Sequence, residues 1–217
     1  MSSPLLRAGS AKGGGYYGNI RRDLLDALPR PLGAVLDIGC GEGAAAELLR
    51  EAGATRITGV EPVLKAANLA RGRYDEVLAV GVEEALGRLE GPFDVILLHD
   101  LLEHLVDPAA VVRELRLRAA AGGHIQVSVP NARHVSLLWD LAIRGTFGYT
   151  EWGHRDSTHL RWFTRRDIVA LLEDCGWSVL STSHPVLGRS RLLDRLTGGR
   201  STEFLVGQWY VLARCPG

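Results

Sequence analysis

Apolar positions along the chain fall into short, nearly continuous runs, separated by longer stretches in which they recur at helical spacing. Apolar runs of about four to eight residues are typical of strands buried on both faces of a parallel sheet. Such runs occur before residue 131 at 35–38, 56–60, 77–80, 93–98 and 124–129. The stretches before and between them predict helices over residues 20–28, 44–52, 63–70 and 108–121. This alternation predicts an α/β fold with a parallel sheet and helices on both faces.

The last part of the chain departs from the alternation. A helix is expected over residues 165–175, with Thr164 as its N-cap. Further apolar runs at 177–183 and 204–213 predict two strands, joined by a basic segment at 187–200 that predicts an exposed helix. Strands connected in this way suit an antiparallel pair at one edge. We therefore expect a seven-stranded, mostly parallel sheet whose last strand is antiparallel.

An insertion at about 131–163 separates these two parts and is rich in aromatic and histidine side chains. Such a segment suits a lid over a ligand pocket, and a helical cap packed on the sheet is the alternative. Residues 1–15 are mostly Ser, Gly and Ala, and we expect a flexible N-terminus there. Residues 16–217 then form one domain. Candidate walls of an acceptor pocket in the insertion are Phe147, Trp152 and Trp162.

Composition narrows the function classes. Lys+Arg and Asp+Glu balance at 25 each, so no net field would recruit nucleic acid or an acidic membrane. The cysteines, Cys40, Cys175 and Cys215, are too few and too scattered for a disulfide framework and favour a reducing compartment. No run has the length of a membrane span or the form of a signal peptide. We expect a cytoplasmic protein without a membrane partner.

A glycine-rich turn follows the first strand, in the sequence Val-Leu-Asp-Ile-Gly-Cys-Gly-Glu-Gly at 35–43. Glycine lets the backbone turn sharply with no Cβ between it and a ligand. Glu61-Pro62 ends the next strand about 20 residues later, where an acid can accept hydrogen bonds from a ribose diol. Glu42 places a negative charge inside the turn, where a dinucleotide would put its diphosphate. The turn therefore favours a nucleoside without phosphates over NAD.

Residues 35–43 resemble motif I of the class I S-adenosylmethionine-dependent methyltransferases, which have a Rossmann-like fold. The later motifs agree in order over nearly the whole chain. Leu102-Glu103-His104-Leu105 with Asp107-Pro108 resembles the signature of the small-molecule (type 23) branch that includes ubiquinone-biosynthesis O-methyltransferases. Pro130-Asn131 and residues 158–164 resemble bacterial members found with glycan or natural-product pathways.

The resemblance implies S-adenosylmethionine as cofactor and assigns residues to it. Glu61 matches the acid that binds the ribose, residues 81–83 match the segment beside the adenine, and His99 lies near the methionine part. Tyr17 is a candidate for closing over the cofactor. The residues assigned to cofactor binding are Tyr17, Asp37, Gly39, Cys40, Gly41, Glu61, Pro62, Gly81, Val82, Glu83 and His99.

Polar side chains follow the fourth strand, where ligands bind in sheets of this type. Asp100, Glu103 and His104 are spaced i, i+3 and i+4, so on a helix they would share one face. Two carboxylates and an imidazole suit a divalent cation such as Mg²⁺. The spacing also resembles the E-x-x-E-H metal motif of small-RNA 3′-terminal 2′-O-methyltransferases, with Asp one methylene shorter at the first position. In that comparison His159 matches a downstream histidine.

These residues are the candidates for chemistry. A metal would be held by Asp100, Glu103, His104 and His159, and the catalytic residues would be Glu103, His104 and His159. A purely structural role is the alternative, in which Glu103 caps a helix and His104 packs below the cofactor.

The sequence thus predicts an S-adenosylmethionine-dependent methyltransferase that acts on a small-molecule hydroxyl of a sugar or natural product, as a monomer or homodimer. Three alternatives stay open. The acceptor is the nitrogen of an amino sugar, or it is an RNA 2′-hydroxyl, or the chain binds the cofactor without catalysis. The neutral charge balance weighs against RNA.

Overall fold

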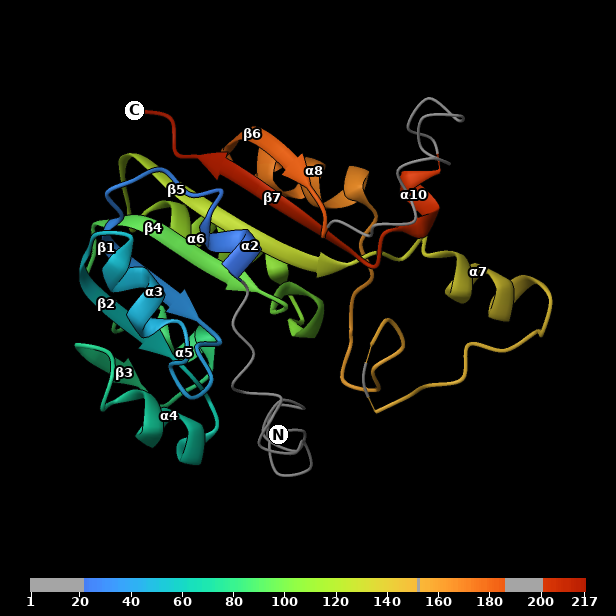
Figure 1. The fold of residues 1–217 in the computed structure, drawn as a ribbon, viewed down its shortest axis with the longest axis horizontal. Helices are drawn as coiled ribbons and strands as arrows, with labels where there is room; N and C mark the ends of the chain where they lie inside the picture. Colours follow the sequence, from blue (N-terminus) through green and yellow to red (C-terminus); the bar gives the residue numbers. More distant parts are fainter. Residues whose placement is uncertain (1–21, 152, 186–200) are drawn as a thin grey trace.

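The computed structural model describes residues 22–151, 153–185 and 201–217, and its strands form one sheet in the order β3-β2-β1-β4-β5-β7-β6 (Figure 1). The strands are β1 Gly33–Ile38, β2 Ala54–Val60, β3 Glu76–Leu78, β4 Phe93–His99, β5 Ala119–Pro130, β6 Ser178–Ser183 and β7 Gln208–Arg214. The helices are α2 Arg22–Leu25, α3 Ala46–Glu51, α4 Leu64–Ala70, α5 Val82–Ala85, the 3₁₀ turn η1 Leu102–His104, α6 Pro108–Arg116, α7 Val135–Ala142, α8 Arg165–Asp174 and α10 Thr202–Leu205.

Strand directions confirm the predicted fold class. Strands β1 to β5 pair in parallel, whereas β7 is antiparallel to both β5 and β6. The central strands are apolar at successive positions because helices cover both faces of the sheet. The sheet is therefore Rossmann-like, seven-stranded and mostly parallel, with an antiparallel last strand.

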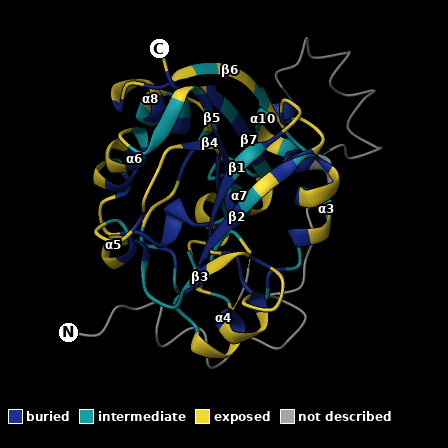
Figure 2. Cartoon of the chain, turned by 90° about the vertical axis from the view of Figure 1, so that its left-hand side faces the viewer, coloured by how far each residue is buried: buried dark blue, intermediate teal, exposed yellow. Residues whose placement is uncertain are grey.

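Alternate side chains of the central strands enter two separate cores. Leu36 and Ile96 belong to the core that α5, α6 and α8 complete, whereas Val35 and Val95 belong to the core under α2, α3 and α4. Figure 2 shows the same layering, with dark blue central strands and yellow outer faces on the helices. This explains why the strand sequences show no polar alternation.

Several boundaries differ from the sequence prediction, most of all at the connection of α6 to β5 and at the start of β7. Helix α6 ends at Arg116, and Ala119 already pairs with Phe93 at the start of β5, so strand pairing overrides the helical pattern there. Residues 204–205 belong to helix α10, because β7 pairs with β5 only from Gln208 onward. The flexible segment at 1–15 and the basic helix at 187–200 lie outside the described residues.

The register of the parallel strands brings their carboxyl ends to one level. Ile38 lies opposite Val60 on β2 and opposite Leu98 on β4, and Val60 lies opposite Leu78 on β3. The residues that follow these strands therefore meet at one edge. Because the chain order reverses between β1 and β4, this edge is the topological switch point, where such sheets bind ligands.

The insertion leaves this edge and then returns to it. Figure 1 shows α7 and the loop after it extending away from the sheet. The chain comes back where Phe163 bridges Asn131, directly after β5. Whether the insertion closes over a ligand stays a prediction. Among the described residues, none of the helices combines the length and apolar character that a membrane crossing requires.

Replacing Asp107 by Ala tests the helix start that the sequence predicts. The Asp107 carboxylate accepts a hydrogen bond of 2.9 Å from the Ala110 amide at the N-terminus of α6. We expect the variant to lower the free energy of unfolding in urea by about 1 kcal/mol. The matched control is Glu114→Ala, which removes the same charge from an exposed ion pair with Arg118 and should cost less than about 0.5 kcal/mol. Equal losses would contradict the capping role.

Candidate active site

The turn after β1 is built from glycines in the left-handed region of backbone conformation. Gly39, Gly41 and Gly43 have φ of 81°, 55° and 73°, which residues with a Cβ adopt only with strain. The Gly39 and Cys40 amides donate to the Val60 carbonyl, at 2.7 and 3.2 Å. The left-handed glycines confirm the sharp turn that the sequence predicts, and the two hydrogen bonds fix it against the end of β2.

Glu61 joins this turn to the start of the next helical segment. One oxygen of its buried carboxylate accepts from the Gly41 amide at 3.0 Å, and the other accepts from the Val63 amide at 2.9 Å. Burial raises the pKa of the Glu61 carboxyl, the two amides lower it, and the nearby Asp37 raises it. Each carboxylate oxygen keeps a second lone pair for a ligand hydroxyl.

Asp37 is the second buried acid at this edge, and its partner was not foreseen from the sequence. The Tyr74 hydroxyl donates to the Asp37 carboxylate at 2.6 Å. Burial raises the pKa of the Asp37 carboxyl, although the Tyr74 hydrogen bond and the nearby His99 act in the opposite direction. Nothing in the sequence pattern links Tyr74 to a position 37 residues earlier.

His99 ends β4 and connects this edge to the first described helix. Gln126 donates from Nε2 to the Leu24 carbonyl at 2.7 Å, so its Oε1 is the atom that accepts from His99 Nε2 at 3.0 Å. His99 therefore carries its proton on Nε2 when neutral. The ring lies near Asp37, where it is predicted to meet the methionine part of the cofactor.

The remaining residues predicted to bind cofactor divide into three groups. Gly81 is the N-cap of α5, and Val82 and Glu83 form its first turn beside the end of β3. Pro62 directly follows Glu61, and Cys40 is buried in the glycine turn, where burial raises the pKa of its thiol. Tyr17 and the predicted pocket wall Trp152 lie outside the described residues.

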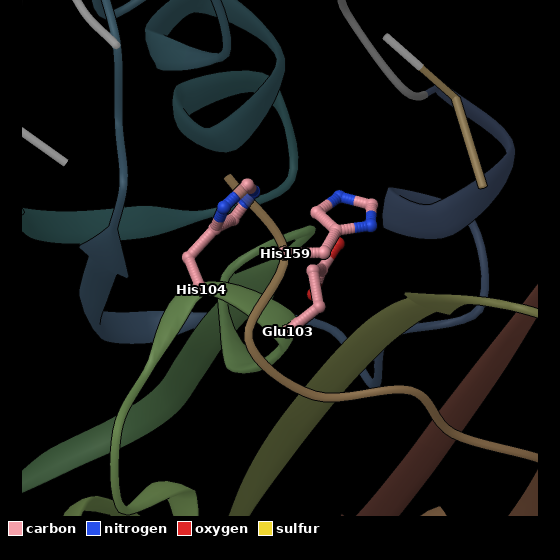
Figure 3. A group of neighbouring side chains, drawn as sticks. All are labelled: Glu103, His104 and His159. Carbon is pink, nitrogen blue, oxygen red and sulfur yellow. The ribbon is translucent and has the colours of Figure 1, made fainter. Parts of the chain in front are cut away.

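Glu103, His104 and His159 come together although 55 residues separate the last two. All three are buried, and one potential ligand atom from each lies within 4.8 Å of the other two. The rings of His104 and His159 meet edge to face, with centroids 4.8 Å apart. Figure 3 shows Glu103 and His104 rising from η1, and His159 from the returning chain, toward the same side.

Asp100 does not lie in this group. It has a φ of 51° and precedes η1, so the helical spacing assumed from the sequence does not hold across residues 100–104. Its carboxylate accepts from Ser128 at 2.9 Å and from Gln208 at 2.8 Å, which directs it toward β5 and β7. The structure thus brings together three of the four residues predicted to hold a metal.

Aromatic and histidine contacts organise the insertion. Phe147 meets Trp162 edge to face with ring centroids 5.5 Å apart, so two predicted pocket walls touch. His134 caps α7 and stacks on His154, with centroids 4.6 Å apart, and His154 Nε2 bonds to the Gly207 carbonyl at 2.8 Å. The histidine stack therefore ties α7 to the start of β7.

A family model described as a methyltransferase domain matches residues 15–182. The chain belongs to this family of class I S-adenosylmethionine-dependent methyltransferases. The glycine turn, the acid after β2 and the order of the strands are therefore features of the methyltransferase fold, and they confirm the family that the sequence motifs indicate.

Curated relatives resemble about half of the methyltransferase chain. A ubiquinone biosynthesis O-methyltransferase of Bordetella pertussis is 37% identical over 111 residues, which are 48% of this chain and 46% of the relative. One from Escherichia coli is 37% identical over 117 residues, 51% of this chain and 48% of the relative. The chain thus spans about half the length of the curated relatives it matches.

Solved structures share the fold over most of the chain. The structural alignment with an S-adenosylmethionine-dependent methyltransferase from Mesorhizobium loti covers 89% of this chain and 96% of the Mesorhizobium chain, with 20% identity and a TM-score of 0.61. A putative methyltransferase in complex with the Trm112 activator of Haloferax volcanii has a TM-score of 0.68 and 14% identity, and both chains are fully covered. The [4+2]-cyclase SpnF has a TM-score of 0.61 at 18% identity, with 89% of this chain and 80% of its own covered.

Tyr74→Phe should weaken the glycine turn. The substitution removes only the hydroxyl group, which donates a hydrogen bond to the buried Asp37 carboxylate. We expect the free energy of unfolding at neutral pH to fall by about 1–3 kcal/mol, measured in urea. Tyr149→Phe is the matched control, since Tyr149 is 62% exposed. A loss no larger than that of the control would show that the Tyr74 hydroxyl does not support Asp37.

Acid should loosen the insertion at the His134–His154 stack. Burial lowers the pKa of both rings below their ordinary 6.5, and His154 lowers the pKa of His134 further. A lowered pKa means that the fold favours neutral rings, so the contact is stable above pH 6.5 and weakens as pH falls below it.

We expect amide hydrogen exchange in α7, corrected for the intrinsic rate, to accelerate as pH falls from 7 to 5. Each pH unit by which the fold lowers the pKa of one of the two rings corresponds to about a tenfold acceleration. His134→Asn keeps a side-chain acceptor for the helix cap and should reduce this acceleration. If exchange accelerates equally in the variant and in the wild type, protonation of the His134–His154 stack is not the cause of the acceleration.

Proposed function

We propose that this methyltransferase transfers the methyl group of S-adenosylmethionine to a hydroxyl oxygen of a small molecule such as a sugar or a natural product. The main support for this proposal is the buried group of Glu103, His104 and His159, which lies at the edge of the sheet where β4 ends. A neutral hydroxyl is a weak nucleophile until it loses its proton. The relatives from Bordetella and Escherichia are named for O-methylation, which supports an oxygen acceptor.

In this proposal, Asp37 and Glu61 bind the cofactor, and the histidines beyond β4 accept the proton of the acceptor hydroxyl. S-adenosylmethionine supplies an activated methyl group on a positively charged sulfur. Glu61 holds the ribose hydroxyls with its remaining lone pairs, and Asp37 receives the ammonium group. An imidazole of His104 or His159 takes the proton of the acceptor hydroxyl as the oxygen–carbon bond forms and the carbon–sulfur bond breaks.

The same three side chains fit a divalent cation. Two imidazole nitrogens and a carboxylate are a donor set that suits borderline ions such as Mn²⁺, Fe²⁺ or Zn²⁺ better than Mg²⁺. Their separation of up to 4.8 Å exceeds the spacing of about 3–4 Å around a single ion, so the group would contract slightly on binding. A bound cation would lower the pKa of an acceptor hydroxyl.

The other candidate functions differ in what they require of this group. An amine acceptor has its own lone pair and needs less help from a base. RNA would need a basic surface, whereas the chain has equal numbers of basic and acidic residues. A cofactor-binding protein without catalysis would need none of the three side chains, and the fold alone does not decide the reaction.

The variants Glu103→Gln and His159→Ala test the proposal. We expect each to lower kcat by about 10²–10⁴-fold, measured as S-adenosylhomocysteine release across a panel of phenols, sugars, amines and RNA. S-adenosylmethionine affinity, measured by calorimetry, should stay within about twofold, because Glu103 and His159 are not among the residues proposed to bind the cofactor. Measuring turnover after chelation, and again after addition of Mn²⁺ or Mg²⁺, tests whether the reaction depends on a divalent cation.

The matched control is His124→Gln, which replaces a histidine that pairs with Val95, four residues before the end of β4. It should leave turnover unchanged. Full turnover in both test variants, with cofactor still bound, would exclude the proposed chemistry. Preference for amines or RNA in the panel would replace the proposed acceptor.

A further inference from the structure

The returning chain beside η1 contains a short hydrogen-bond chain that leads to His104. Asp156 is buried, and its Oδ1 accepts from the Thr158 amide at 2.9 Å and from the Thr158 hydroxyl at 2.7 Å. His104 Nδ1 lies 3.1 Å from the Thr158 hydroxyl oxygen and 3.2 Å from the Thr158 carbonyl oxygen. One residue of the insertion thus offers two oxygens to one ring nitrogen.

Hydrogen-bond directions fix which nitrogen of His104 carries the proton. The Thr158 carbonyl only accepts. The Thr158 hydroxyl donates to Asp156, because an ionised carboxylate has no proton to donate and can only accept. Both Thr158 oxygens therefore face His104 as acceptors, and Nδ1 must be the donor. In a neutral imidazole the other nitrogen, Nε2, then has the lone pair.

The backbone around Thr158 is held independently of this contact. The Leu160 and Arg161 amides donate to the Glu103 carbonyl at 2.7 and 3.1 Å, and the His159 amide donates to the Asp156 carbonyl at 3.0 Å. The Thr158 oxygens are thus presented to His104 by a segment that is docked on η1 through its main chain. Changing the Thr158 side chain should leave this docking in place.

We propose that Thr158 and Asp156 are positioning residues, which hold His104 as the Nδ1–H tautomer and keep Nε2 as its proton-accepting or metal-binding nitrogen. The proposal rests on the function proposed above for His104 and extends it to two residues of the insertion. It assigns the insertion a role in the chemistry, because the correct tautomer forms only when residues 156–161 have returned to η1. Polar partners behind a functional histidine typically change activity or metal affinity by about 10–100-fold.

The tautomer can be read in metal-free protein, without any turnover. Nitrogen-15 NMR of the histidine rings at pH 8, with His104 assigned through the His104→Gln variant, should show Nδ1 protonated and Nε2 unprotonated. Thr158→Val removes one acceptor and should shift His104 toward the Nε2–H tautomer, whereas Thr158→Ser restores the hydroxyl and should preserve the wild-type spectrum. A wild-type spectrum in which His104 carries its proton on Nε2 would overturn the proposal, whether or not the Thr158 variants fold.

Kinetics give the second readout. Thr158→Val should lower kcat by about 10–100-fold with an unchanged dissociation constant for S-adenosylmethionine, and Thr158→Ser should recover most of the turnover. The two failures are distinguishable. An active wild type with the Nε2–H tautomer overturns the positioning role alone. Full turnover in His104→Gln overturns the function proposed for His104, and with it the role of Thr158 and Asp156.

Discussion

The structure depends most on one buried carboxylate that holds two main-chain turns together. Glu61 accepts from the Gly41 amide with one oxygen and from the Val63 amide with the other. Hydrogen bonds to a charged group are worth about 1.5–3 kcal/mol each, and a buried carboxylate without such donors would be costly. Glu61 thus fixes the glycine turn relative to β2 while its remaining lone pairs stay directed at the ligand edge.

The register of the sheet turns this local arrangement into a site. Because Ile38, Val60 and Leu98 are level, Glu61, which follows β2, and His99, which ends β4, lie at the same edge as the glycine turn. The acid and imidazole group lies just beyond β4, in η1, and is completed by His159. The described residues predicted to bind the cofactor lie at the ends of β1, β2 and β4 and at the start of α5, whereas the proposed catalytic group needs a segment that follows the whole parallel sheet.

The sequence predicts what depends on neighbours along the chain. The buried strands, the glycine turn, the acid after β2 and the Asp107 and Thr164 caps are all local patterns, and the structure confirms them. The prediction that Asp100 shares a helix face with Glu103 and His104 was wrong. Asp100 itself has a left-handed backbone conformation, which interrupts the assumed helix, and no spacing rule signals that. Tyr74 beside Asp37, and Thr158 beside His104, are contacts across the fold, so a single sequence does not contain them as a pattern.

Electrostatics supports the prediction that this edge binds a cationic nucleoside in preference to a dinucleotide. Burial raises the pKa of both Asp37 and Glu61, and the nearby Asp37 raises the pKa of Glu61 further, so ionised Asp37 makes ionisation of Glu61 more costly. In the proposed binding mode the ammonium group of the ligand lies beside Asp37, and its positive charge would offset the cost of ionising that buried acid. A dinucleotide would instead add a diphosphate next to two acids and the Glu42 of the turn. In the proposed binding mode, the acids around the glycine turn therefore disfavour a ligand with a diphosphate.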